Sequence, residues 1–376
     1  MSPSVLSVDE PFDLLSGTTI LEFGDDLAGS IAAYHLALLG ATVYLLEPPE
    51  GCWLRRVRAE AGASGNGALF ACFGRGKRSV ALADALASPE AVWNALDVVI
   101  EPVRRGLELP LACRAGAQGG PMALSFREDD GSRFTELSAQ AAFGLSAYLG
   151  RREEAPLRVG FEVLTYSAAV LAVQSVLAAL PLRKAHGLSQ RLRVPVSRVA
   201  ASILNNVTTA SVEPDQEVGF SRGWASSPYY GIPCSDGEVE ILFYGPRADE
   251  GWRQFCERAG MPQLGADPRF STYRARTQFA GDVGAAVAPV TSTMRRDVLL
   301  QLLWDCGAMA VPRWGVDEAA ASEQAAANGL VLSRPAEEAF QLLASPWALD
   351  GQRASLRSLP ALADATAEFG ALGGRV

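Results

Sequence analysis

The chain has 376 residues, of which 49% are hydrophobic and 20% charged, and its formal net charge is −9. This length exceeds one ordinary domain of roughly 100 to 200 residues, and the high apolar content excludes extensive disorder. The excess of acidic residues disfavours a nucleic-acid partner, because binding to a phosphate backbone depends on clustered Lys and Arg.

Cysteine and histidine usage argues against a metal site. The six cysteines form no C-x-x-C pair and there are only two histidines, and scattered thiols of this kind fit a reducing cytoplasm. The N-terminal residues lack the basic region of a signal peptide. The longest apolar stretch, residues 168–182, is shorter than the roughly 20 residues that cross a bilayer. We therefore expect a cytoplasmic protein without a metal cofactor or a membrane span.

Strand and helix signals alternate along residues 1–212. From Arg158, a short strand is expected to run into a long apolar helix, with Thr165 at the junction. Such alternation predicts an α/β fold with a mostly parallel, doubly wound sheet. The other expected strands are 18–23, 41–47, 79–82, 97–101, 122–126 and 193–197, and the other expected helices are 31–39, 88–96 and 136–148.

The character of the sequence changes after about Val212, where Gly, Ser and Pro become frequent and helical periodicity is lost. Beyond this connection we expect a strand at 238–243 and helices at about 250–259 and 295–305. These elements predict a smaller α+β domain.

The turn after the first strand, GDDLAG, could be considered for a dinucleotide. It lacks the G-x-G-x-x-G pattern, and Asp25 and Asp26 stand where a pyrophosphate would have to bind, although Glu47 could hold a ribose. Two carboxylates would repel the phosphates. The favoured interpretation is a strand-to-helix turn with capping acids and no nucleotide redox cofactor.

The loop GRGKRS, residues 74–79, places Lys77 and Arg78 before a strand, where they could contact a diphosphate or simply be solvated. His35 lies among apolar residues of a helix and His186 lies in a polar turn. Both are expected to be structural, since no nucleophile motif such as G-x-S-x-G accompanies them.

Five of these stretches occur together, in order, in the family III CoA-transferases, also called the CaiB/BaiF family, and the chain is similar to that family over nearly its whole length. The stretches are ILEFGDDLAGSIAAYHLALLGATVYLLEPPEG, RGKRSVAL, LDVVIEPVRRG, PLRVGFEVLTYSAAVLAVQSVLAAL and LGADPRFSTYRARTQ. The resemblance implies a Rossmann-like large domain from residues 1–212, a connection and small domain at 213–330, and a C-terminal segment, 331–376, that returns to the large domain. It also implies an interlocked dimer.

The family's reaction moves CoA from an acyl-CoA to a carboxylic acid, and its racemase branch inverts the carbon next to the thioester. In the transferases an aspartate five residues after a glycine attacks the thioester. Here the glycine is Gly160 and the fifth residue is Thr165. A hydroxyl is a poor nucleophile without a base, and Glu162 would face the other way if 162–165 were extended. Alternatively, Thr165 is an ordinary helix N-cap.

Other family positions carry over unevenly. Leu27 replaces a glutamine that contacts the acyl group, and Thr135 stands where the racemases have their histidine. Glu136 matches an acid near the acyl pocket, so the resemblance assigns Leu27, Thr135 and Glu136 to the substrate pocket. Lys77, Arg78 and Arg133 match basic CoA-binding positions.

The resulting interpretation is a degenerate, non-catalytic chain of a CoA-transferase, with acyl-CoA as its substrate, that pairs with a catalytic paralogue or with itself. Dicarboxylic or aryl-succinate acids are the substrate types considered. One alternative is an active transferase or racemase-like enzyme in which Thr165 orients the substrate and Glu136, Asp25 or Asp26 supplies the acid or base. A second alternative is a regulatory protein that only senses acyl-CoA.

Overall fold

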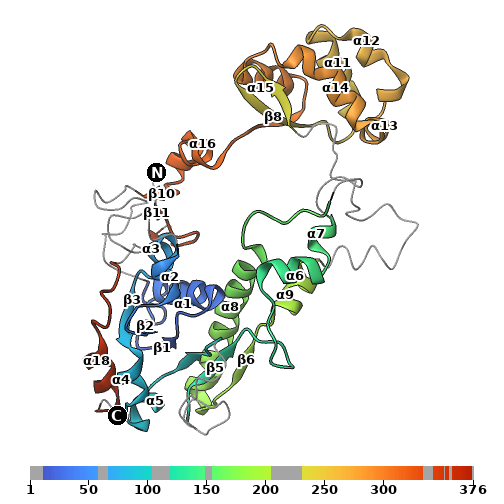
Figure 1. The fold of residues 1–376 in the computed structure, drawn as a ribbon. Helices are drawn as coiled ribbons and strands as arrows, with labels where there is room; N and C mark the ends of the chain where they lie inside the picture. Colours follow the sequence, from blue (N-terminus) through green and yellow to red (C-terminus); the bar gives the residue numbers. More distant parts are fainter. Residues whose placement is uncertain are drawn as a thin grey trace. The chain divides into compact units, whose positions relative to one another are not determined.

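The computed structural model describes residues 12–57, 67–103, 119–148, 155–204, 231–332, 342–350, 352–354 and 358–374. The chain divides into two compact units (Figure 1). The large unit comprises residues 1–145, 158–205 and 323–376, and the small unit comprises 146–157 and 206–322.

The large unit is built on six parallel strands in the order β3-β2-β1-β4-β5-β6. Its four central strands are buried, as expected for parallel strands covered on both faces, whereas β6 lies at an edge and is largely exposed. The mixed α/β fold with a parallel sheet predicted from the sequence is confirmed. The strands are β1 (Thr19–Glu22), β2 (Thr42–Glu47), β3 (Lys77–Ala81), β4 (Val98–Ile100), β5 (Met122–Ser125) and β6 (Arg191–Arg193).

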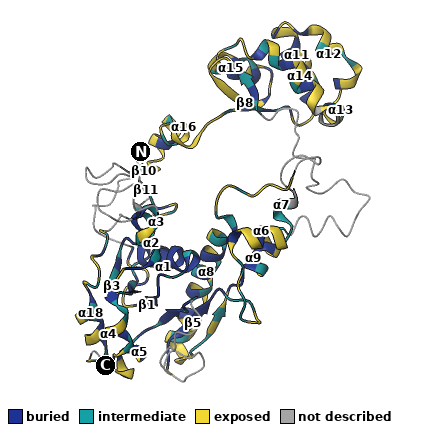
Figure 2. Cartoon of the chain, viewed as in Figure 1, coloured by how far each residue is buried: buried dark blue, intermediate teal, exposed yellow. Residues whose placement is uncertain are grey.

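Alternate residues of the strands enter two different cores, because successive side chains of a strand point to opposite faces. Ile20 packs with helices α1 (Leu27–Leu38) and α8 (Val163–His186). Its neighbour Leu21 packs with a second layer that includes Trp93 and Phe369. Figure 2 shows the buried positions gathered on the sheet and on α1. The second layer consists of α4 (Leu82–Leu86), α5 (Glu90–Asn94), α18 (Thr366–Gly370) and η4 (Ala371–Gly374).

The strand expected from Arg158 is absent, and this prediction is wrong. Residues 158–162 form no strand, and α8 begins at Val163. The backbone of this segment is held by a helix side chain instead of a neighbouring strand, since the N–H of Val159 donates to Gln140 Oε1 of α6 at 2.9 Å. The last strand expected at 193–197 is displaced to β6, since helix α9 (Val196–Ile203) already begins within that range.

Helix α8 has 24 residues and is apolar enough, by length and composition, to cross a membrane. One of its faces packs against α1, and Ala168, Ala172 and Val176 are buried there. It is thus a core helix of the large unit. Its first turn leads into the candidate site.

The remaining elements of this unit are α2 (Trp53–Arg56), α3 (Ala68–Phe73), α6 (Glu136–Ala142), α17 (Glu323–Ala327), β10 (Val331–Leu332), β11 (Leu342–Leu343), β12 (Ala348–Leu349) and β13 (Gln352–Arg353), and the short α7 (Leu145–Tyr148) spans the boundary between the units.

The small unit has a three-stranded antiparallel sheet, β7-β8-β9, packed against helices around a core that includes Trp252, Phe255 and Leu303. Its predicted strand and two predicted helices are confirmed as β8, α11 and α15. The elements are β7 (Ile232–Cys234), β8 (Gly237–Leu242), α11 (Ala248–Arg258), α12 (Pro262–Ala266), η3 (Pro268–Phe270), α13 (Tyr273–Gln278), α14 (Ala280–Thr291), α15 (Arg296–Asp305), β9 (Met309–Arg313) and α16 (Val316–Ala320).

Candidate active site at the carboxyl edge of the parallel sheet

The candidate site lies where the strand order changes direction, beside β1 and its neighbour β4. Ligands of open α/β sheets bind at such a point, outside the carboxyl ends of the strands. The loops that follow β1, β4 and β5 are joined there. Asp25 accepts a hydrogen bond from the backbone N–H of Val103 at 2.9 Å, and Arg127 donates to the carbonyl oxygen of Pro102 at 3.2 Å.

Asp26 begins helix α1 as its N-cap, accepting from the N–H of Gly29 at 3.1 Å, as expected for a capping acid. Its other oxygen pairs with Arg133 from the loop before α6. Burial raises the pKa of Asp26, an effect that the Arg133 guanidinium opposes. The predicted CoA-binding Arg133 is therefore already engaged with one of the two acids of the first turn, while about a third of its side chain stays accessible.

The carboxylate of Glu136 lies directly against the first turn of α8. Its Oε2 accepts from both the backbone N–H and the hydroxyl of Thr165, each at 2.8 Å. Its Oε1 accepts from the N–H of Leu164 at 3.1 Å and from Nε2 of Gln140 at 2.7 Å. Glu136 is buried at 9% exposure. A side chain from α6 thus satisfies two of the otherwise free N–H groups at the start of α8.

Thr165 is the third residue of α8, and its predicted role as the N-cap is wrong. The N-cap is Glu162, whose side chain makes no capping bond and instead pairs with Arg158 at 2.7 Å. The carboxylate that reaches the Thr165 hydroxyl is therefore Glu136, 29 residues away in the chain. The sequence placed Glu136 near the pocket, but it offered no reason to pair it with Thr165.

His35 contacts the residue that follows Thr165 in the chain. Its Nε2 is 3.1 Å from the hydroxyl of Tyr166. The pKa of His35 is lowered by burial, so the neutral ring is favoured. The ring joins α1 to α8, which agrees with the structural role predicted for it.

The two basic residues of the GRGKRS loop have different environments. The ammonium of Lys77 is buried and donates to Glu22 at 2.8 Å and to the carbonyl oxygen of Ser30 at 3.0 Å. Arg78 is 41% exposed and pairs with Glu368. Burial raises the pKa of Glu22 even though Lys77 stands beside it. The Lys77 side chain is 0% exposed, so a phosphate has no access to its ammonium and Lys77 is left out of the site that we propose.

Leu27 and Thr135, the two predicted pocket positions, each lie at the start of a helix. Leu27 begins α1 and packs, partly buried, against the apolar core. Thr135 is the N-cap of α6 and accepts from the N–H of Ser138 at 3.3 Å.

Glu47, considered for a ribose, accepts from Arg55, Ser79 and the N–H of Cys52. Burial raises the pKa of this carboxyl, but these hydrogen bonds outweigh it and the net pKa is lowered.

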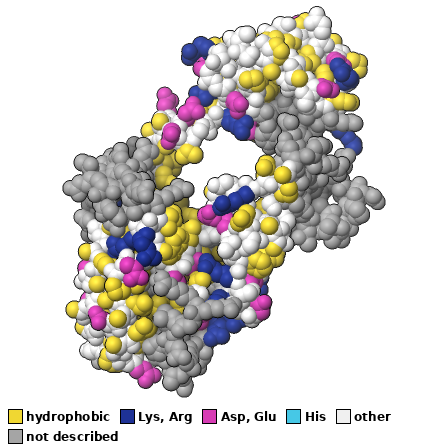
Figure 3. All heavy atoms as spheres, viewed as in Figure 1, with side chains coloured by type: hydrophobic (Ala, Val, Ile, Leu, Met, Phe, Trp, Pro, Cys, Tyr) yellow, Lys and Arg dark blue, Asp and Glu magenta, His cyan; other side chains and the backbone are white. Residues whose placement is uncertain are grey.

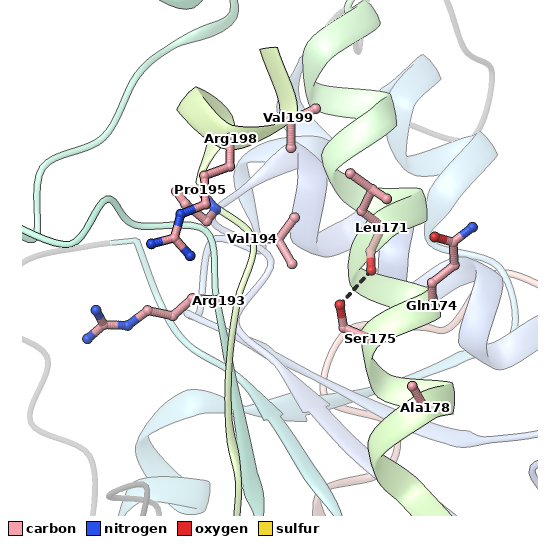
Figure 4. Close-up of a pocket in the computed structure, with 9 residues that line it drawn as sticks. All are labelled: Leu171, Gln174, Ser175, Ala178, Arg193, Val194, Pro195, Arg198 and Val199. Atoms are coloured by element: carbon pink, nitrogen blue, oxygen red, sulfur yellow. Dashed lines mark hydrogen bonds between the residues drawn. The ribbon is translucent and has the colours of Figure 1, made fainter. Parts of the chain in front are cut away.

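A separate hollow of about 390 Å³ lies farther along α8, beside β6 and the start of α9 (Figure 4). Apolar side chains such as Leu171 and Val199 line it, together with Arg193 and Arg198. Both arginines pair with Asp129, at 3.1 and 2.8 Å. None of the predicted site residues lines this hollow. Among the described residues, no cluster of three or more His, Cys, Asp or Glu side chains could hold a metal ion.

Comparison with known proteins identifies the family to which the chain belongs. The model of "CoA-transferase family III" matches residues 15–107 and 131–365. The chain belongs to this family. Family III CoA-transferases use CoA thioesters as substrates, which is the chemistry that the site has to serve.

Curated relatives and solved structures agree with this assignment. The chain is 26% identical over 340 residues to the "Probable fatty acyl-CoA transferase Rv3272" of Mycobacterium tuberculosis, covering 81% of this chain and 84% of that one. It is also 26% identical to the "Succinate--glutarate CoA-transferase" of Agrobacterium fabrum over 356 residues, covering 86% of each. Its fold is similar to a CAIB/BAIF family protein from Brucella suis with a TM-score of 0.81 and 22% identity, covering 97% of this chain and 100% of that chain.

Proposed function

We propose that this family III chain is a degenerate subunit of an acyl-CoA:carboxylate CoA-transferase that does not itself catalyse CoA transfer, and that a catalytic paralogue supplies the attacking aspartate. The observation that carries the proposal is the environment of Thr165. Its position in the first turn of α8 is the one that the family resemblance assigns to the nucleophile, yet that turn, which the structure describes in full, contains no acidic residue.

The neighbouring carboxylate does not replace the aspartate as an attacking group. A carboxylate has about four acceptor positions, and Glu136 receives four hydrogen bonds, two at each oxygen. Attack on a thioester carbon would require Glu136 to release donors that hold the start of α8 in place. Glu136 is therefore proposed as the residue that anchors the pocket, with Leu27 and Thr135 beside it.

The surface of α8 supports a partner chain. Although the opposite face of the helix is buried, Tyr166, Val170 and Leu177 are 38–40% exposed. Hydrophobic side chains reach the surface of both units (Figure 3). Large apolar side chains on one helix are typical of a surface that another chain covers. We propose that the partner is the catalytic paralogue or a second copy of this protein, that the two chains interlock around a Rossmann-like large domain, and that the assembly lies in the cytoplasm.

Arg78 and Arg133 are the proposed contacts for the phosphates of CoA, since both are partly exposed and guanidinium groups bind phosphate in a bidentate manner. The acceptor acids that we propose are short dicarboxylic acids. The relative named as a succinate–glutarate CoA-transferase supports this choice.

The test measures CoA transfer from succinyl-CoA to glutarate with the purified chain alone, with its paralogue alone and with both together. We expect transfer by the mixture and a rate lower by several orders of magnitude for the isolated chain, because loss of a catalytic nucleophile has that effect. The matched control is the paralogue with its aspartate replaced by asparagine, which should silence the mixture. Ordinary enzymatic rates from the isolated chain would refute the proposal.

A further inference from the structure

We infer that Thr165 and Glu136 form a nucleophile–base pair through which the chain, without a partner, hydrolyses acyl-CoA thioesters. This activity differs from CoA transfer. It rests on the proposed binding of CoA thioesters and does not depend on the paralogue.

The geometry of the pair meets the requirements for an activated hydroxyl. The nucleophile and base of such a pair lie within about 2.6 to 3.2 Å, and a third group orients the base. Here the Thr165 hydroxyl donates to Glu136 Oε2 at 2.8 Å, and Gln140 donates to the other oxygen at 2.7 Å. The N–H groups of Leu164 and Thr165 fix the carboxylate further.

The base of the pair is buried and its nucleophile is accessible, as attack on a bound thioester requires. Glu136 is buried, so water does not compete for its carboxylate, whereas Thr165 is only partly buried and can be reached from outside. Occupied oxygens, which keep Glu136 from attacking carbon, do not keep it from taking a proton from a hydroxyl that already donates to it.

In the acylation step, Thr165 Oγ1 attacks the thioester carbonyl carbon while Glu136 Oε2 takes the hydroxyl proton. The tetrahedral intermediate then breaks its C–S bond, and the departing thiolate receives the proton from Glu136. An acyl ester on Thr165 and free CoA thiol result. In the second step water attacks this ester, Glu136 accepts a proton from the water, and the proton passes to Oγ1 as the C–O bond breaks. The net reaction is acyl-CoA plus water to carboxylic acid plus CoA thiol.

The same chemistry disfavours CoA transfer by this chain. An alkoxide is a poorer leaving group than a carboxylate or a thiolate, so the ester on Thr165 is less activated than the anhydride that an aspartate would form. A carboxylic acid acceptor cannot readily displace the alkoxide, and the CoA thiol released during acylation does not readily take the acyl group back from the ester. Water activated by Glu136 is the remaining acceptor.

The experiment incubates the purified chain, without any paralogue, with succinyl-CoA and with acetyl-CoA, and measures the release of free thiol. We expect turnover that falls at least 100-fold in Thr165→Val and in Glu136→Gln, since removing a general base costs about 10²–10⁴-fold. Thr165→Ser should keep the rate within about tenfold. The matched control is Ser167→Ala, which removes a hydroxyl two residues away that donates to the carbonyl oxygen of Val163.

Peptide mass spectrometry can detect an acyl group on residue 165, which would not form if Thr165 had only a structural role. An acyl group should be found on Thr165 in the wild type and on the substituted serine in Thr165→Ser, and the corresponding peptide of Thr165→Val should carry none. No thiol release by the wild type, or release unchanged in a folded Thr165→Val variant, would overturn the inference. The proposed function stands if the chain alone makes no glutaryl-CoA but supports transfer with its paralogue, and it fails if the chain alone makes glutaryl-CoA.

Discussion

The ammonium of Lys77 donates to Glu22 Oε1 at 2.8 Å in a part of the sheet where both side chains are at most 1% exposed. The pair links β3 to β1 across β2. A buried ion pair contributes little net stability compared with an apolar pair, but removing one partner leaves an uncompensated buried charge. The pair therefore has a structural role in the sheet, because each charge is tolerated there only in the presence of the other.

Replacing Lys77 with Met should lower the free energy of unfolding by about 3–5 kcal/mol, because Glu22 is then left without its cation. The double variant Glu22→Leu/Lys77→Met should recover most of this loss. Urea denaturation of the two single variants, the double variant and the wild type measures the coupling. Lys184→Met, at an exposed position on α8, is the control. Additive effects of the two single substitutions would contradict the expectation.

The parallel sheet was predictable because its signals are local. The runs at β1, β2 and β4 are short and apolar, and Asp26 caps α1 from the neighbouring position as a sequence pattern can indicate. The strand expected from Arg158 failed for a non-local reason, since the N–H of Val159 is bonded to the side chain of Gln140 on α6 instead of to a neighbouring strand.

The candidate site was only partly predictable for the same reason. The residues were identified, but their partners lie far away: Glu136 is 29 residues from Thr165 and Glu368 is 290 from Arg78. The spacing of Glu136 and Gln140, four residues apart on α6, was a local signal that the carboxylate is held by its own helix. Burial of Lys77 left no comparable signal, because its basic loop has the same sequence pattern whether it is solvated or buried.

Arg78 and its partner Glu368 offer a test of CoA binding that spares the core. Because the pair is partly exposed, Arg78→Ala should change the free energy of unfolding by no more than about 1 kcal/mol. The same substitution should weaken CoA binding about 10-fold, at the lower end of the value of a charge-assisted hydrogen bond. Glu368→Gln should strengthen binding by releasing Arg78. Calorimetric titration with CoA measures the affinities. Equal affinities in the wild type, Arg78→Ala and Glu368→Gln would show that Arg78 does not contact CoA.

Restoring an acid at position 165 tests whether the rest of the pocket can still transfer CoA. In Thr165→Asp the new carboxylate stands next to Glu136, and two carboxylates this close share a proton, which raises one of the two pKa values. We expect transfer from succinyl-CoA to glutarate at least about 100-fold above Thr165→Asn, which has the same shape without the charge. Equal rates in the two variants would mean that more than the nucleophile is missing.

The burial of His35, whose ring contacts Tyr166, makes part of the stability depend on pH. Burial lowers the pKa of His35 from its ordinary 6.5, so the folded chain favours the neutral ring. Above about pH 6.5 the ring is neutral in both states and this contribution is fully present. As the pH falls through 6.5 toward the lowered pKa, the unfolded chain takes up a proton first and stability is lost, by about 1.4 kcal/mol for each unit of lowering.

His35→Gln, which is neutral at every pH, should remove this part of the profile. The unfolding free energy of the wild type minus that of the variant is expected to fall between pH 7.5 and pH 5, because carboxyl groups contribute equally to both proteins and cancel in the difference. His186→Gln, at the exposed end of α8, is the matched control. A difference that stays flat for His35→Gln would show that the ring takes up its proton equally in the folded and unfolded chains, and that its contact with Tyr166 survives protonation.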